Sequence, residues 1–216
     1  SIFHAIKNGL GIEIDIRFTK DYVPIVIHDD YLERLCGVEN YLSNFNFNET
    51  KLLKLKNNEV LPTLWEILSI VDGNTPILIE FKKLNKTQDH KFFKNDLYHS
   101  LKNYFGPIAL MSFDLQLITY LSKKLPNIKR GLVIEKYDYN KKIYSSNVEN
   151  IITENQMQKN EISFVSFEYS KLTKEFYNIN KTKKRNVIAW TINSKLDAIK
   201  MKNFCDTITF EGFNPI

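Results

Sequence analysis

Residues 11–19 of the chain read Gly11-Ile12-Glu13-Ile14-Asp15-Ile16-Arg17-Phe18-Thr19. Apolar and charged side chains alternate along this stretch, and a period of two is typical of a β-strand whose successive side chains face opposite ways. One face of the predicted strand is therefore apolar, and the other carries Glu13, Asp15 and Arg17. The alternation alone is equally typical of a half-exposed strand without a site, so the neighbouring segments have to distinguish the two interpretations.

Two further apolar runs also end in polar side chains. Ile25-Val26-Ile27 is followed by His28-Asp29, and Ile77-Leu78-Ile79 is followed by Glu80-Phe81-Lys82. Carboxylates at the ends of buried strands cost free energy unless they are paired or bound to a metal. Glu13, Asp15 and Glu80 therefore predict a site for a hard divalent cation, because Mg²⁺ and Ca²⁺ take oxygen ligands.

These residues belong to an ordered series of motifs that covers nearly the whole chain. The series runs through Ile12 to Asp15, Thr19-Lys20-Asp21, Pro24 to Asp29, Leu61-Pro62-Thr63-Leu64, Ile79 to Lys82, Met111-Ser112-Phe113-Asp114 and Ala189-Trp190-Thr191-Ile192-Asn193. In this order the motifs resemble the glycerophosphodiester phosphodiesterase family, in its compact bacterial type without a large inserted domain. The resemblance implies metal-dependent hydrolysis of glycerophosphodiesters to glycerol 3-phosphate and an alcohol.

The resemblance also implies roles for individual side chains. Glu13, Asp15 and Glu80 match the metal ligands of the family, for which we expect Mg²⁺ or Ca²⁺. His28 matches one of two histidines that handle protons. This role agrees with the chemistry, because a cation neutralises the phosphodiester oxygens and an imidazole can protonate the departing alkoxide. Trp190 resembles a late aromatic residue that lines the substrate pocket, and a core tryptophan is an equal alternative.

Two basic side chains join the predicted site through strand parity. Glu80 and Lys82 are two residues apart and point the same way, so Lys82 can meet a phosphate oxygen while the carboxylate holds the ion. The alternative for Lys82 is an ion pair with Glu13 or Asp15. Arg17 lies on the face of these acids and can also touch phosphate. We therefore predict His28 and Lys82 as catalytic residues and Arg17 and Trp190 as substrate-binding residues.

The composition is that of a folded protein with one domain. The 216 residues are 43% hydrophobic and 25% charged, and the net charge is +5. A chain of this length fits a single domain, which we place at residues 1–216. The basic residues are spread through helix-like segments, which favours solvated faces over a nucleic-acid surface. We expect a small-molecule phosphodiester as partner and no nucleic acid.

Cysteine usage and hydropathy give a weak indication of location. Cys36 and Cys205 are far apart without metal-type spacing, which predicts free thiols in a reduced compartment. No apolar run approaches the roughly 20 residues of a membrane span. We expect a cytoplasmic protein, and a removed signal peptide is the alternative. The sequence does not indicate an oligomeric state.

Strand-like and helix-like segments alternate along the chain. We predict strands at 11–18, 76–82, 108–113, 129–135, 162–168, 187–192 and 206–210, with Pro24 to His28 counted as an extension of the first. We predict helices at 1–9, 64–71, 89–105, 114–124, 172–181 and 194–204, of which the second begins at a Thr63–Glu66 capping box. In the polar passage 31–60, a loop and a short helix are expected to be anchored by Phe45, Phe47, Leu52, Leu53 and Leu55. In 137–160, a weak helix signal runs through Val148, Ile151 and Ile152.

This alternation predicts an α/β fold with a parallel sheet covered on its outside. A (β/α)8 TIM-type barrel is implied by the family resemblance and needs eight strands, one more than the seven predicted. The first strand of the family ends in His-Arg-Gly before the helix that opens this chain, so we expect that strand to be missing from the sequence. In such a barrel the site lies at the C-terminal ends of the strands.

Two other functions remain open from the sequence. One is a catalytically silent binding domain, because the second histidine of the family belongs to the His-Arg-Gly strand. A second departure supports this alternative, because the usual Thr-Asp-x-Pro appears as Thr209-Phe210-Glu211-Gly212. The other is a related phospholipase D-type enzyme that acts on lysophospholipids or glycopolymers.

Overall fold

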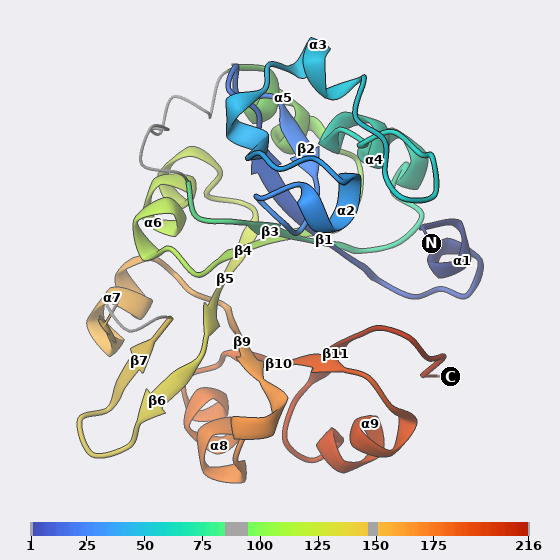
Figure 1. Cartoon of the computed structure of the whole chain (residues 1–216). Helices are drawn as coiled ribbons and strands as arrows, with labels where there is room; N and C mark the ends of the chain where they lie inside the picture. Colours follow the sequence, from blue (N-terminus) through green and yellow to red (C-terminus); the bar gives the residue numbers. More distant parts are fainter. Residues whose placement is uncertain (1, 85–94, 147–150, 216) are drawn as a thin grey trace. The chain divides into compact units, whose positions relative to one another are not determined.

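The computed structural model of the protein describes residues 2–84, 95–146 and 151–215. The chain divides into two compact units, Ser1–Leu110 and Met111–Ile216, which are described separately (Figure 1). The assignment of residues 1–216 to one domain stays a prediction. The seven principal strands predicted from the sequence are all present, as β1, β3, β4, β5, β9, β10 and β11.

The first unit contains the strands that carry the predicted carboxylates. Its strand order is β4-β3-β1-β2, and these strands span Ile108–Ser112, Ile77–Phe81, Ile12–Phe18 and Pro24–Val26, with β4 continuing into the second unit. Strands β1 and β3 are parallel and lie side by side, with Asp15 opposite Glu80 (Figure 1). Along β1 the apolar side chains are buried and the charged ones are half-buried, as the alternation predicts.

Strand β2 runs antiparallel to β1, with Ile16 opposite Val26. The prediction that Pro24 to His28 extends the first strand is therefore wrong. A tight turn reverses the chain, because Tyr22 adopts a left-handed φ of 67° and the Thr19 hydroxyl accepts a hydrogen bond from the Val23 N–H at 2.9 Å. After β2 the Ile27 N–H still donates to the carbonyl oxygen of Asp15 at 2.9 Å. The hairpin therefore delivers His28 next to the charged face of β1.

The helices of the first unit are α1 (Ile2–Lys7), α2 (Glu33–Cys36), α3 (Phe47–Thr50), α4 (Leu64–Val71) and α5 (Asn95–Asn103), with a 3-10 turn η1 at Leu42–Asn44. Helix α4 begins at the predicted capping box, in which the side chains of Thr63 and Glu66 each accept a backbone N–H of the other residue. Of the predicted helix 89–105, residues 89–94 lie outside the described residues.

A small apolar core supports the passage between β2 and α4. It consists of six buried side chains, Ile25, Ile27, Leu32, Leu42, Leu53 and Leu61. Phe45, Phe47 and Leu55 pack against this core, as predicted. Leu52, by contrast, is 82% exposed, so its predicted anchoring role is wrong. It follows the end of α3, where the next residue, Leu53, turns inward instead.

The second unit is also built on parallel strands. Their order is β5-β9-β10-β11, and they span Lys129–Ile134, Phe164–Glu168, Asn186–Ile192 and Thr207–Phe210. Helices α6 (Leu115–Lys124), α8 (Lys174–Thr182) and α9 (Lys195–Met201) each follow one strand and precede another, and η3 spans Tyr169–Lys171. Asp114 caps α6 by accepting the Gln116 N–H at 2.8 Å, and the Ser194 hydroxyl caps α9 by accepting the Asp197 N–H.

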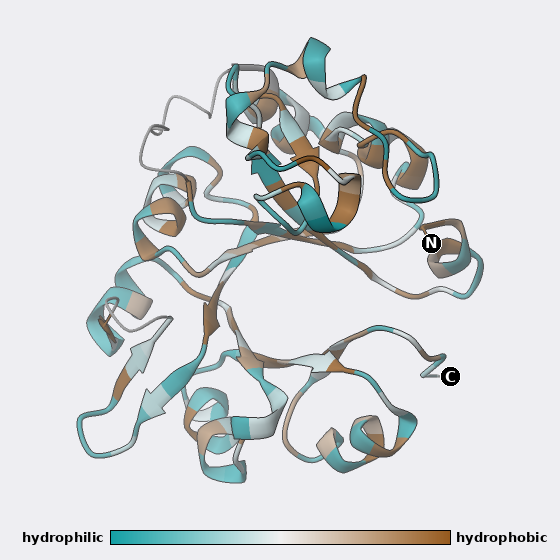
Figure 2. Cartoon of the chain, viewed as in Figure 1, coloured by the Kyte–Doolittle hydropathy of each residue, from teal (hydrophilic) through white to brown (hydrophobic). Residues whose placement is uncertain are grey.

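A small antiparallel sheet was not predicted. Strands β6 (Lys136–Asp138), β7 (Ile143–Ser145) and β8 (Ile151–Thr153) form it, and α7 (Glu154–Lys159) follows. The helix expected through Ile151 and Ile152 is therefore wrong at these residues, and Val148 lies outside the described residues. Tertiary packing overrides the weak local signal, because the rings of Tyr137 and Tyr144 pack in a tilted arrangement with 4.8 Å between centroids and both contact Phe176. Figure 2 shows that the turn between β6 and β7 is hydrophilic, which left little pattern to detect.

Candidate active site

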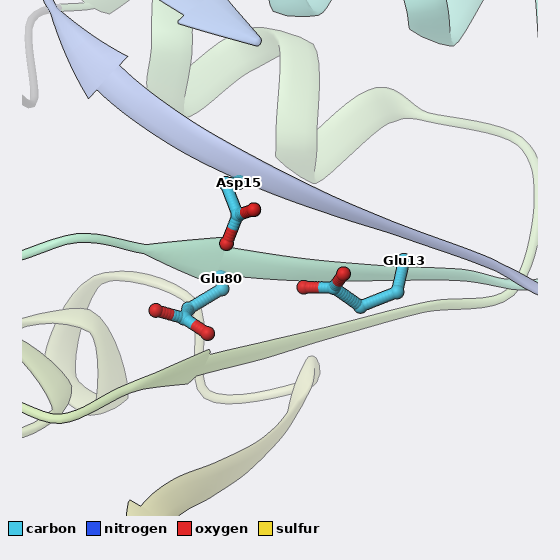
Figure 3. A group of neighbouring side chains, drawn as sticks. All are labelled: Glu13, Asp15 and Glu80. Atoms are coloured by element: carbon cyan, nitrogen blue, oxygen red, sulfur yellow. The ribbon is translucent and has the colours of Figure 1, made fainter. Parts of the chain in front are cut away.

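Three carboxyl groups converge on neighbouring strands of the first unit. Glu13 and Asp15 come from β1 and Glu80 comes from β3, and an oxygen of each lies within 4.8 Å of the others (Figure 3). Two features of the sequence cause this convergence. Residues two apart on β1 share a face, and the parallel register places Asp15 opposite Glu80. The cluster predicted from the sequence is thus formed.

Lys82 lies against two of these carboxylates. Its Nζ is 2.7 Å from Asp15 Oδ1 and 2.5 Å from Glu80 Oε1. The ion pair between Lys82 and Asp15, one of the two pairs considered from the sequence with Glu13 or Asp15, is therefore present. Glu80 is a further partner that the sequence analysis did not consider. Burial opposes the charge on Lys82, but the two carboxylates outweigh it and raise the pKa of the lysine. The ammonium group is thus kept charged at the centre of the acids.

The electrostatics of the cluster call for more positive charge than Lys82 supplies. Burial raises the pKa of Glu13 to about 8, and repulsion by Asp15 and Glu80 adds to the effect. Burial also raises the pKa of Glu80, although Lys82 opposes the shift. These shifts mean that the three acids cannot all ionise easily side by side.

The donor set and charge of the cluster fit a divalent cation. Three carboxylates and one ammonium leave a net charge of −2, which is the charge that such an ion compensates. The donors are oxygens, which Mg²⁺ and Ca²⁺ prefer, and among the described residues no histidine or cysteine belongs to the group. The half-buried Glu13 and Asp15 and the buried Glu80 would hold the ion, and its identity is not fixed by this geometry.

His28 and Arg17 lie near each other and on the side of the first unit that carries the carboxylate cluster. The charge of His28 acts on the carboxyl group of Glu80, although the imidazole itself is 65% exposed. Arg17 Nε donates to the carbonyl oxygen of His28 at 2.7 Å. Burial lowers the pKa of Arg17, while nearby acids including Asp30 and Asp15 counteract the shift. Arg17 thus supports the backbone at His28, and its contact with phosphate stays a prediction.

Trp190 belongs to the second unit, on β10. Its indole ring meets Phe113 edge to face, with 6.1 Å between ring centroids. The Nε1 atom of Trp190 is buried and makes no hydrogen bond to any described residue. This contact agrees with a packing role, and the predicted role in substrate binding stays a prediction.

Sequence reasoning missed two side chains near His28. Asp29 contacts the imidazole directly, and Arg34 contacts Asp29. His28 Nδ1 lies 2.8 Å from Asp29 Oδ1, and the same carboxylate receives two hydrogen bonds from Arg34. The only signal in the sequence was the adjacency of His28 and Asp29. Arg34 could not be found in this way, because its contact depends on the loop that carries α2.

The structure combines parallel strands that alternate with helices and an acidic cluster beside a lysine. These features define a class of α/β proteins with a candidate metal site. A sequence profile of the glycerophosphoryl diester phosphodiesterase family matches residues 1–208. The chain therefore belongs to this family, as the sequence motifs predict.

Two relatives support this membership. A glycerophosphodiester phosphodiesterase of Caldanaerobacter subterraneus is 25% identical over 134 residues, which cover 58% of this chain and 55% of that protein. The chain thus spans about half the length of this relative. A protein of Bacillus subtilis, named provisionally for the same activity, is 23% identical over an alignment that covers 92% of this chain and 81% of that protein.

An Oleispira antarctica phosphodiesterase, solved with its product sn-glycerol-3-phosphate, shares the fold. Its TM-score is 0.82 at 19% identity, over 97% of this chain and 84% of that chain. The fold class is therefore the (β/α)8 TIM type, as predicted. Among the described residues of this chain, helices long and apolar enough to cross a membrane are absent.

Proposed function

We propose that this protein is a metal-dependent glycerophosphodiester phosphodiesterase that releases glycerol 3-phosphate and an alcohol. The observation that carries the proposal is the cluster of Glu13, Asp15 and Glu80 with Lys82 between two of its members. Family membership and the product named for the Oleispira antarctica structure support the substrate class. The substrate is a small molecule, and we propose Mg²⁺ or Ca²⁺ as the ion.

Lys82 and His28 each have a task in this reaction. When bound, the divalent ion supplies positive charge that neutralises the phosphodiester oxygens. Lys82, held charged by Asp15 and Glu80, binds a further phosphate oxygen. His28 donates a proton to the departing alkoxide, because an imidazole can exchange protons near neutral pH and this one is exposed to a substrate.

Hydrolysis assays with and without a chelator test the proposal. Purified full-length protein is expected to release glycerol 3-phosphate from glycerophosphocholine or glycerophosphoethanolamine when Mg²⁺ or Ca²⁺ is present. Excess chelator should abolish turnover, and readdition of the divalent ion should restore it.

A reaction with an acylated substrate provides the control. Lysophospholipid tested in parallel distinguishes the proposed activity from that of a phospholipase D-type relative. Full-length protein that binds the diester but shows no metal-dependent turnover would contradict the proposal and favour a silent binding domain.

A further inference from the structure

A chain of polar contacts runs from Arg34 through Asp29 to the imidazole of His28. Arg34 Nε donates to Asp29 Oδ2 at 2.6 Å, and Arg34 Nη2 donates to Asp29 Oδ1 at 2.9 Å. Asp29 Oδ1 also lies 2.8 Å from His28 Nδ1. The roles derived so far use His28 and leave Asp29 and Arg34 without a task.

We propose that Asp29 and Arg34 are positioning residues that hold His28 in the tautomer protonated on Nδ1 and aim its Nε2 at the substrate. The proposal rests on the proposed function of His28 as proton donor. In this arrangement the cationic ring carries a proton on each nitrogen. The Nε2 proton passes to the departing oxygen, and the ring is left as the neutral tautomer protonated on Nδ1, which still donates to Asp29.

The protonation state of Asp29 sets the tautomer. The hydrogen bonds from Arg34, opposed by burial and aided by the contact with His28, lower the pKa of Asp29 to about 2. Asp29 is therefore ionised near neutral pH and can only accept hydrogen bonds. His28 must then place a proton on Nδ1, which leaves Nε2 as the nitrogen that exchanges protons with a substrate.

Exposure indicates that this chain of contacts orients His28 more than it stabilises the fold. The side chains of His28 and Arg34 are 65% and 66% exposed, whereas that of Asp29 is 18% exposed. Ion pairs between exposed groups contribute little to stability. A two-point contact does fix direction, because Arg34 engages both oxygens of Asp29 and so prevents rotation of the carboxylate.

The segments that carry His28 and Arg34 are both anchored in one apolar core. Leu32 is fully buried before α2, and Leu35 packs against the same apolar core as Ile25 and Ile27. Ile27 directly precedes His28, while Leu32 and Leu35 flank the segment that carries Arg34. The core therefore keeps Arg34 and His28 at a fixed separation, with Asp29 between them.

Arg34→Ala tests the proposal with a readout that does not require turnover. In ¹⁵N-histidine-labelled full-length protein, the wild-type NMR spectrum should show His28 as the Nδ1-protonated tautomer. The variant should show a mixture of tautomers, and kcat for glycerophosphocholine should fall about tenfold with KM nearly unchanged. Asp29→Asn should alter the tautomer in the same direction and lower kcat by about 10²-fold, within the contribution of a positioned acid.

Two further variants keep the test specific. Arg34→Lys retains the charge with a single donor group and should recover part of kcat. Glu33→Ala alters the exposed neighbour on α2 and should leave the tautomer and kcat at wild-type values. Unfolding midpoints should agree among all variants.

The NMR and kinetic readouts separate this proposal from the proposed function. Wild-type tautomer and kcat in both Arg34→Ala and Asp29→Asn would overturn the positioning role. A changed tautomer in a protein without any turnover would support the positioning contact and overturn only the proposed function.

Discussion

Replacing His28 with glutamine is expected to lower kcat for a glycerophosphodiester by about 10² to 10⁴-fold, the range that a positioned general acid contributes. The change removes the group that we propose to protonate the departing alkoxide and leaves Glu13, Asp15 and Glu80 intact. Because the side chain is 65% exposed, the free energy of unfolding should stay within about 0.5 kcal/mol of the wild-type value. Steady-state kinetics and denaturant unfolding measure the two effects separately.

His4 provides a matched control for this substitution. It lies on α1, outside the strands that carry the carboxylate cluster. His4→Gln should retain wild-type kcat. A His28→Gln variant that keeps more than half of the wild-type kcat would show that His28 does not transfer the proton.

The second large effect concerns stability and comes from a buried ion pair in the second unit. Arg185 is 3% exposed, and its guanidinium forms two hydrogen bonds with Glu154, from Nη1 to Oε2 at 3.0 Å and from Nη2 to Oε1 at 2.5 Å. Arg185 Nη1 also donates to the hydroxyl of the fully buried Tyr144 at 3.3 Å. This pair joins α7 to the start of β10 and to the small antiparallel sheet.

Glu154→Gln is expected to destabilise the protein by about 3 kcal/mol. That value is the lower end of the range for removal of one partner from a buried ion pair, and it applies because Glu154 itself is 23% exposed. The loss arises mainly because the cation of Arg185 stays buried without its counter-ion. Urea unfolding monitored by circular dichroism measures the change.

The contribution of Glu154 should depend on pH in a defined direction. Burial opposes ionisation of Glu154, but Arg185 outweighs it and lowers the pKa of the carboxyl group below its ordinary value. A group with a lowered folded-state pKa contributes stability above its unfolded pKa and loses it as pH falls through the folded pKa. The difference between wild type and Glu154→Gln should therefore be full at pH 6 and shrink below about pH 4.5.

Lys200→Gln is the control for the ion-pair prediction. Lys200 and Asp197 form a pair on α9 in which the lysine is 58% exposed, so the substitution should cost less than about 1 kcal/mol. Equal losses in the two variants would contradict the account of Glu154, as would a Glu154→Gln effect that does not change between pH 6 and pH 4.

The carboxylate cluster could be predicted because it depends on local rules. A period of two places Glu13 and Asp15 on one face of β1, and Glu80 and Lys82 share a face for the same reason. Parallel pairing of β1 and β3 then needs only the alternation of strands and helices, which the sequence displays clearly. For Lys82 the sequence allowed a phosphate contact or, as the alternative, an ion pair with Glu13 or Asp15. The structure shows the ion pair with Asp15.

The features that escaped prediction depend on tertiary structure. The direction of β2 follows from the left-handed backbone at Tyr22, a residue type that gives no hint of positive φ. The small sheet from β6 to β8 is held by contacts of Tyr137 and Tyr144 with Phe176, which lies far from both in sequence. Arg34 contacts Asp29 only because the small apolar core between β2 and α4 holds α2 near β2.

Calorimetric titration of Mg²⁺ and Ca²⁺ into wild type and Glu13→Gln tests the candidate metal centre most directly. Wild type is expected to bind one divalent ion, and Glu13→Gln should bind it more than about tenfold more weakly, because even changes beyond the ligands cost 10- to 100-fold. The stabilisation that the ion gives to wild type should shrink in the same variant. Glu161→Gln, which changes a carboxylate of the second unit that is 73% exposed, should retain wild-type affinity. Equal affinities in wild type and Glu13→Gln, or no binding by wild type, would contradict the assignment of Glu13, Asp15 and Glu80 as ligands.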